Sequence, residues 1–432
     1  MTSQRTSDDL DRLLTAWFDA DAQVREPEDL LETVLDRTSR ARRRPTWLLP
    51  ERWIPMQLTM PFRTAPRLAP TLLLIVVLLL AAAIAIVAVG SAKRLPAPFG
   101  PAANGQLAYV SAGQIFTANA DGSAGRAITS GERAAATPIW SRDGKRIAYK
   151  LIGASSPTDN PTLYGDLVVV NSDGSNPIVL DSNTTGMSAT EWSLDGRFVL
   201  YSRVEGKLDQ IFVAASDGSA RPVRVGDAAT PNWSPRWSPN GKSIAYLVDG
   251  DAAPKGSVGV WLMDIDGSHA RKLTTETYAG FNSITWNHNG TQLAFTGSQG
   301  TNLDLWIVGL DGRPERAITT DHGGASGASW SPDGSQLAYL VAANEFRTVA
   351  KIVVARGDGS DPHQLDGVFG WPDPQWSPDS TRLAGVGAGA TDLSIYLLDP
   401  AGVAERIVIE TSLPSISAAA AFDMASWQRL AP

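Results

Sequence analysis

The feature that most constrains the fold is a tryptophan that recurs along the last three quarters of the chain. Six copies begin a polar turn of the form Trp-Ser-Pro-Asp-Gly or a close variant, and a seventh stands near the C-terminus without that turn. They are Trp140, Trp192, Trp237, Trp286, Trp330, Trp376 and Trp427. Neighbouring copies lie 52, 45, 49, 44, 46 and 51 residues apart. The chain therefore repeats one structural unit rather than joining unrelated domains.

Two further elements recur in each unit and predict four short strands. A hydrophobic strand follows the turn, as in Ile147-Ala148-Tyr149, and an Asp-Gly turn ends the next β-rich run, as at Asp311-Gly312. Asp-Gly and Asn-Gly pairs favour hairpins because both residues tolerate a positive φ. Four strands in a unit of about 40–50 residues are typical of a β-propeller blade.

The order of these elements predicts how the ring of blades closes. The series begins with the second strand of a blade, at Leu107-Ala108-Tyr109, and ends with the tryptophan element around Trp427. Joining the two ends completes one blade and removes a free sheet edge. We therefore expect an all-β fold over residues 104–432, a β-propeller of seven four-stranded blades closed by the C-terminal strand. The alternative is six blades with extra strands.

The repeated motif also carries a family resemblance. Trp-Ser-Pro-Asp-Gly followed by Leu-Ala-Tyr and then by Asp-Gly-Ser resembles the TolB-type, WD-like β-propeller repeats of bacteria, over about residues 104–430. The resemblance implies the propeller fold more firmly than a function, because such propellers serve as binding platforms, as scaffolds and as lids on peptidases. TolB itself has an α/β domain before six blades, whereas this chain has an apolar segment there. A role with the Tol system is therefore not implied.

That apolar segment predicts a membrane span. Residues 71–89 carry no charge, and as a helix they would reach roughly 28 Å, about the thickness of a bilayer core. A secretory signal peptide would place its apolar region much nearer the N-terminus. We predict a single transmembrane helix over 68–92 and a Pro-rich linker over 93–103, with cleavage near Gly90-Ser91-Ala92 as the lesser alternative.

The flanking charges predict the orientation of this helix. Six arginines between residues 42 and 67 precede it, whereas only Lys93 and Arg94 follow it. Positive charge favours the cytoplasmic side, so we expect the N-terminus in the cytoplasm and the propeller on the outer side of the cell membrane. Residues 1–67 are expected to form a cytosolic segment with two short amphipathic helices. This layout resembles that of bacterial membrane-bound anti-sigma factors, although residues 1–100 contain none of the His and Cys that bind zinc in that family.

The sequence shows no catalytic constellation and no cofactor motif. The chain contains no cysteine and no Gly-x-Ser-x-Gly elbow of a hydrolase, and the glycines from Gly385 to Gly389 open no helix as a dinucleotide loop would. Four histidines fall in or next to turns of different repeats, which does not predict a metal site. They are His269, His288, His322 and His363. We expect neither a metal nor a cofactor.

Two of the 14 tryptophans are candidate ligand contacts. Trp233 and Trp371 lie outside the repeat register, in Pro-rich approaches to the next repeat tryptophan, where we expect them near a channel mouth. Aromatic side chains there could contact a sugar or a peptide. Residues 95–432 hold 24 basic and 34 acidic residues. This excess of negative charge argues against nucleic acid or anionic lipid as a ligand of the propeller.

Together these observations predict a membrane-anchored, extracytoplasmic β-propeller that binds a protein, a peptide or a cell-wall glycan without catalysis. Two alternatives remain open. In the first, the N-terminal helices hold a cytosolic protein such as a sigma factor, and the propeller is the sensor. In the second, a sugar lyase or hydrolase has its site in the propeller channel, formed by side chains from several blades.

Overall fold

The computed structural model describes residues 101–153, 164–276, 278–299, 303–319, 324–342, 350–367, 369, 373–388, 393–402, 407–410 and 425–430. The predicted cytosolic segment, the predicted membrane span and Trp371 lie outside these ranges. Among the residues that are described, no helix has the length and apolar character needed to cross a membrane. All of them belong to one compact unit within Leu95–Pro432.

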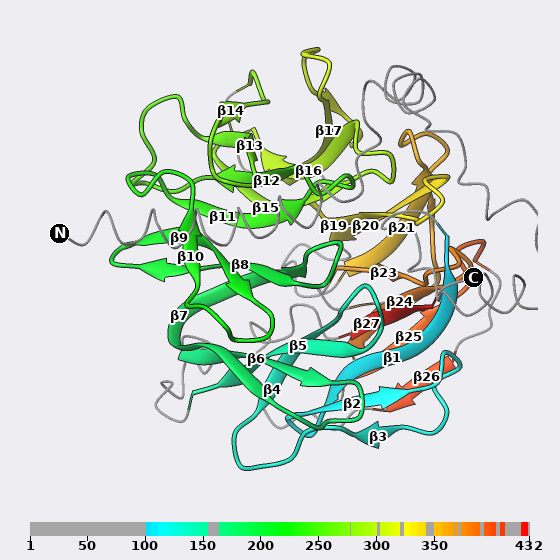
Figure 1. The fold of residues 1–432 in the computed structure, drawn as a ribbon. Coiled ribbons are helices and arrows are strands. Elements are labelled where there is room, and N and C mark those ends of the chain that lie inside the picture. Colours follow the sequence, from blue (N-terminus) through cyan, green and yellow to red (C-terminus); the bar gives the residue numbers. More distant parts are fainter. Residues whose placement is uncertain are drawn as a thin grey trace, which may run out of the picture. The chain divides into compact units, whose positions relative to one another are not determined.

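The described strands form seven blades that follow one another around a central axis (Figure 1). From the innermost strand outward, blade 1 contains β27 (Ala425–Leu430), β1 (Ala103–Ser111), β2 (Gln114–Ala118) and β3 (Arg126–Ala127). Blade 4 contains β11 (Asn232–Trp237), β12 (Ser243–Val248), β13 (Gly259–Asp264) and β14 (Arg271–Lys272). Blade 5 contains β15 (Gly280–Trp286), β16 (Gln292–Ser298), β17 (Leu303–Gly309) and β18 (Arg316–Ala317).

The last two blades repeat this pattern. Blade 6 contains β19 (Ala325–Trp330), β20 (Gln336–Ala342), β21 (Ala350–Arg356) and β22 (His363–Gln364). Blade 7 contains β23 (Gln375–Trp376), β24 (Leu383–Ala388), β25 (Leu393–Leu398) and β26 (Ile407–Glu410). Neighbouring strands within each of these sheets are antiparallel, as short hairpin connections require.

Blades 2 and 3 are joined by one continuous strand. Their seven-stranded sheet contains β4 (Ala135–Trp140), β5 (Arg146–Ile152), β6 (Tyr164–Asn171), β7 (Ile178–Trp192), β8 (Phe198–Glu205), β9 (Leu208–Ala215) and β10 (Val223–Val225). The beginning of β7 pairs with β6, at Val179 with Val168, and its end pairs with β8, at Trp192 with Val199. The strand β7 is therefore the outermost strand of blade 2 and the innermost strand of blade 3.

The predicted closure of the ring is confirmed. The C-terminal strand β27 pairs with β1, where Trp427 lies opposite Leu107 and Ala425 lies opposite Tyr109. The innermost strands also contact one another in ring order, from β27 through β4, β7, β11, β15, β19 and β23 back to β27. The fold is thus an all-β propeller of seven blades, and the six-blade alternative is wrong.

The hydrophobic core lies between the blades, and the repeat tryptophans are central to it. Trp192, for example, is buried in one cluster with Ala148 of the preceding blade, and Trp330 shares a cluster with Ala294. In both cases the alanine is the middle residue of the Leu-Ala-Tyr strand. A small side chain at that position leaves room for the indole ring of the next blade, which explains why the two motifs recur together.

Four indole groups also donate a hydrogen bond to the preceding blade. The acceptor in each case is the carbonyl oxygen of the residue before that blade's own repeat tryptophan or its equivalent. The Nε1–O distances are 2.9 Å from Trp192 to Ile139, 3.3 Å from Trp286 to Arg236, 3.0 Å from Trp376 to Ser329 and 3.4 Å from Trp427 to Gln375. A buried indole N–H needs such a partner, so the tryptophans link blades as well as fill space.

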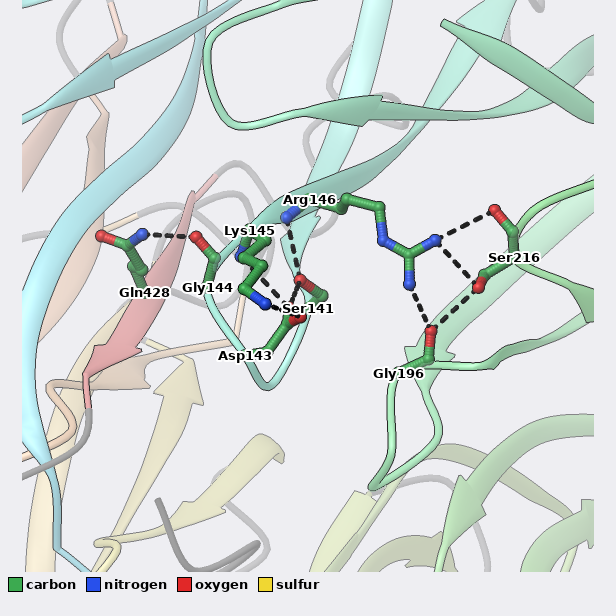
Figure 2. A network of polar contacts seen from close by, with 8 residues as sticks. All are labelled: Ser141, Asp143, Gly144, Lys145, Arg146, Gly196, Ser216 and Gln428. Carbon is green, nitrogen blue, oxygen red and sulfur yellow. Dashed lines mark hydrogen bonds and ion pairs between the residues drawn. The ribbon is translucent and has the colours of Figure 1, made fainter. Parts of the chain in front are cut away.

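Polar contacts at the Trp-Ser turns extend this linkage across three blades (Figure 2). Gln428 of blade 1 donates from Nε2 to the carbonyl oxygen of Gly144 in blade 2, at 2.6 Å. Arg146 of blade 2 donates to the carbonyl oxygen of Gly196 in blade 3, at 2.6 Å, and to Ser216 Oγ, at 3.0 Å. Its guanidinium group also lies 5.0 Å from the centre of the Trp192 ring. The turn is thus a connector between blades.

We expect Trp192→Phe to destabilise the protein more than Trp140→Phe. Both changes replace a buried indole by a smaller ring, but only Trp192 loses a hydrogen bond, because Trp140 Nε1 is buried without a hydrogen-bond partner. The difference in the free energy of unfolding should be about 1–2 kcal/mol. Urea unfolding of the full-length variants, followed by circular dichroism, measures it, and equal losses would contradict a linking role for the indole N–H.

Candidate binding site in the central channel

The channel is lined by the residue that precedes the repeat tryptophan in each blade. Successive side chains of a strand point in opposite directions, so burying the tryptophan between blades turns its predecessor away from that interface. All seven predecessors are half-buried and line one cavity of about 200 Å³. They are Ile139, Glu191, Arg236, Thr285, Ser329, Gln375 and Ser426. We call this space the channel cavity.

A bulge in the inner strands helps to orient these side chains. The pairing register shifts just before the channel residue, between Ala136 and Ile139 in β4 and between Trp233 and Arg236 in β11. Thr137 and Ser234, each three residues before a repeat tryptophan, have φ angles of 51° and 50°. Residues other than glycine adopt this conformation at a cost of about 1 kcal/mol or more. The packed ring therefore maintains a backbone geometry that directs the next residues toward the channel.

A second cavity of about 230 Å³ adjoins the first at one end of the channel. The two share Thr285, Ser329 and Gln375 in their linings. The second cavity extends to the turns that follow the repeat tryptophans, and four of its residues stand two positions after such a tryptophan. They are Arg142, His288, Pro332 and Arg429. We call this space the mouth cavity.

Glu191 lines the channel cavity together with two other ionisable residues, Arg236 and Asp373. Its Oε2 accepts a hydrogen bond from the backbone N–H of Trp237 in the next blade, at 2.7 Å. Burial raises the pKa of the Glu191 carboxyl, and the charge of Arg236, the Trp237 N–H and the charge of Arg142 act in the opposite direction. Burial is the largest of these effects, so the carboxylate form is held in the channel at some cost.

Two arginines place positive charge at the mouth cavity. Burial lowers the pKa of Arg142, which the nearby charge of Glu191 partly offsets. Burial also lowers the pKa of Arg429 to about 10, and the charge of Arg142 acts in the same direction. Both guanidinium groups remain protonated at neutral pH. The mouth therefore holds two like charges close enough to influence each other.

Of the two tryptophans predicted at a channel mouth, the structure describes Trp233. Trp233 lies in β11 opposite Leu247, is half-buried, and packs against the hydrophobic cluster around Phe295. It is not among the residues that line the channel or mouth cavity. Trp371 lies outside the described residues. The ligand contacts of both tryptophans stay a prediction.

Sequence reasoning missed the charged residues that do line the channel, although a signal was present. Glu191 and Arg236 stand one position before a repeat tryptophan, and Arg142 and Arg429 stand two positions after one. Aligning the repeats on the tryptophan and comparing these columns would have collected them. Of the four histidines, His288 lines the mouth cavity, whereas His322 lies outside the described residues. Within the described ranges, no group of three or more metal-ligating side chains could hold a metal ion.

We expect Glu191→Gln to change how stability depends on pH. A raised pKa means that the folded protein binds the Glu191 proton more tightly than the unfolded chain does. The stability from this group is thus fully present below the ordinary pKa of 4.5 and is lost as the pH rises through the raised pKa. The free energy of unfolding of the wild type relative to Glu191→Gln should fall with rising pH, by about 1.4 kcal/mol for each unit of pKa shift.

Urea unfolding between pH 4 and pH 8 measures this difference. Glu132→Gln is the matched control, because Glu132 lies exposed on a turn outside the channel. A difference for Glu191→Gln that stays constant with pH would show that burial does not perturb the channel carboxylate.

Comparison with known proteins agrees with the fold and the repeats. Residues 153–366 match the PD40 family, the TolB beta propeller domain. An uncharacterised protein of Agrobacterium fabrum is 26% identical over 224 residues, which cover 50% of this chain and 73% of that protein. Because this relative has no described activity, it adds no function to the propeller assignment.

Two solved structures share the architecture. A puromycin-hydrolysing peptidase of Mycobacterium tuberculosis has a TM-score of 0.54 at 15% identity, with 75% of this chain and 54% of the peptidase covered. An oligogalacturonate lyase of Vibrio parahaemolyticus has a TM-score of 0.51 at 15% identity, with 71% of this chain and 86% of the lyase covered. At such identities the likeness shows the fold alone. The blades, the repeat motif and the family match together identify this chain as a TolB-like β-propeller protein with PD40-type repeats.

Proposed function

We propose that this protein is a membrane-anchored, extracytoplasmic β-propeller that binds a partner molecule, a protein, peptide or cell-wall glycan, at its channel and does not catalyse a reaction. The observation that carries the proposal is the channel cavity, to which every blade contributes one half-buried side chain. A concave site with a few convergent polar groups is the usual form of a binding site.

The lining supports binding more than chemistry because several of its polar groups already hold the blades together. Glu191 accepts the N–H of Trp237, and Ser426 Oγ accepts the N–H of Trp140 at 3.1 Å. Ser329 Oγ donates to the carbonyl oxygen of Pro374 at 2.6 Å. Such contacts fix the side chains in place, and a rigid set of donors and acceptors lowers the entropic cost of binding a ligand.

The rest of the proposal rests on the sequence before the propeller. The uncharged stretch of residues 71–89 is long enough to cross a bilayer, and the arginines that precede it favour a cytoplasmic N-terminus. A propeller that a linker holds at the outer side of the cell membrane would present its channel to molecules outside the cell. The anchor would then serve the binding function by holding the channel where a partner can reach it.

A photo-crosslinking amino acid at position 285 should capture a partner in intact cells. Thr285 lines both cavities, whereas Val179 lies exposed on β7, outside both, and is the control position. We expect a discrete crosslinked species from position 285 alone, which disappears when Ser329→Trp narrows the channel. Equal capture from position 179, or capture that persists with Ser329→Trp, would argue against a channel ligand.

The absence of cysteine allows a direct test of the membrane orientation. A single cysteine introduced as Val179→Cys should react with a membrane-impermeant maleimide in intact cells. A single cysteine introduced as Ser3→Cys should react only after the membrane is permeabilised. Labelling is read on gels after affinity purification. The reverse pattern, or labelling of neither residue in intact cells, would contradict the proposed orientation.

A further inference from the structure

We infer that the mouth cavity is a carboxylate-binding site that takes the acidic end of a peptide segment from a protein partner. The inference rests on the proposed binding function and names the chemistry that the channel recognises. It follows from the charge of the mouth, the burial of its aromatic residues and the shape of the connected cavities.

The charge of the mouth cavity is opposite to that of the propeller. Its described lining contains Arg142 and Arg429 and no carboxylate, while Glu191, whose charge acts on Arg142, and Asp373 line the adjoining channel cavity. Residues 95–432 as a whole carry 24 basic and 34 acidic residues. Two positive groups gathered at one end of an otherwise acidic ring form a local attraction for an anion.

The two arginines reach the same cavity from different blades. Arg142 follows the repeat tryptophan of blade 2, and Arg429 follows that of blade 1, so the two guanidinium groups come from neighbouring blades. Burial lowers the pKa of Arg429 and the charge of Arg142 acts in the same direction, so the two positive groups lie near enough to act on each other. A carboxylate bound in the mouth cavity would add negative charge beside both groups, in addition to that of Glu191, and guanidinium groups are well suited to pair with it.

The aromatic residues favour a peptide over a sugar acid. Trp286, Trp330 and Trp376 line the mouth cavity, but their exposed fractions are 5%, 9% and 7%. Rings buried to this extent between blades offer edges and no open face on which a sugar could stack. They provide instead an apolar wall of the kind that contacts an aliphatic side chain.

The shape of the site favours the end of an extended chain. The mouth cavity of about 230 Å³ continues into the channel cavity of about 200 Å³, and Thr285, Ser329 and Gln375 line both. These three side chains offer hydroxyl and amide groups along the path, which can pair with the peptide backbone. A peptide that enters along the axis would place its terminal carboxylate or an acidic side chain against the arginines.

A peptide pool tests this inference with the full-length protein in detergent, immobilised through an N-terminal tag. The pool consists of N-acetylated tripeptides with Leu, Asp or Glu at each position, and a second pool is identical except that every C-terminal and side-chain carboxyl is an amide. We expect the wild type to retain the free-acid pool at least tenfold more than the amide pool, as measured by mass spectrometry. Equal retention of the two pools, or no retention of either, would overturn the inference.

Variants then locate the site. Arg142→Gln and Arg429→Gln should each lower retention of the free-acid pool about tenfold or more, because each removes a charged, two-pronged donor. Arg126→Gln is the control, since Arg126 is exposed on the outer strand β3. Arg429→Lys keeps the charge without the fork and should show an intermediate loss. If Arg126→Gln weakens retention as much as the mouth variants do, the site is not the mouth cavity.

Competition with two small anions tests which class of anionic ligand the site takes. D-glucuronate and inorganic phosphate compete with the retained peptides in separate experiments. If glucuronate displaces the retained peptides at a lower concentration than free peptide does, the ligand is a sugar acid and the peptide assignment is overturned. Failure of the inference is distinguishable from failure of the proposed function, because crosslinking at position 285 detects a channel partner whether or not a carboxylate is recognised.

Discussion

The contact between a repeat tryptophan and the preceding blade is the interaction on which the rest of this structure depends. A propeller blade contacts its neighbours and little else, so its stability is largely the sum of blade interfaces. Here six of the seven interfaces have an indole ring in a hydrophobic cluster with the preceding blade, and several contain a hydrogen bond from that ring to a carbonyl of the adjacent inner strand. The alanine of the Leu-Ala-Tyr strand makes this packing possible by leaving the space that the ring fills.

The same contact determines what the channel contains. Burial of the tryptophan turns the preceding residue toward the channel, and the bulge before it keeps the inner strand in that orientation. The tryptophan is constant in all seven blades, while the channel position is occupied by Ile, Glu, Arg, Thr, Ser, Gln and Ser. The residue that packs between blades and the residue that lines the channel therefore occupy adjacent positions of the sequence, so the channel lining can differ from blade to blade while the packing residue is kept.

Much of the fold could be predicted because its signals are local and repeated. The spacing of the tryptophans defined the blades, and the unmatched Trp427 at one end and Leu107 at the other predicted the closing strand. The continuity of β7 between blades 2 and 3 was not predicted, since the sequence motifs mark turns within a blade more clearly than the connections between blades. The placement of Trp233 against the hydrophobic cluster was also missed, because a tryptophan outside the repeat register has no column with which to compare it.

The sequence by itself determined the repeat and predicted how the ring closes, because hairpin turns and strand patterns depend on residues close together in the chain, and the structure decided for seven blades over six. Only the tertiary structure decided which side chains meet. Arg142 and Arg429 are 287 positions apart in the sequence, and they lie at one mouth only because β27 closes the ring beside blade 2. Glu191 and Arg236 line one cavity because the innermost strands of blades 3 and 4 lie side by side in the ring.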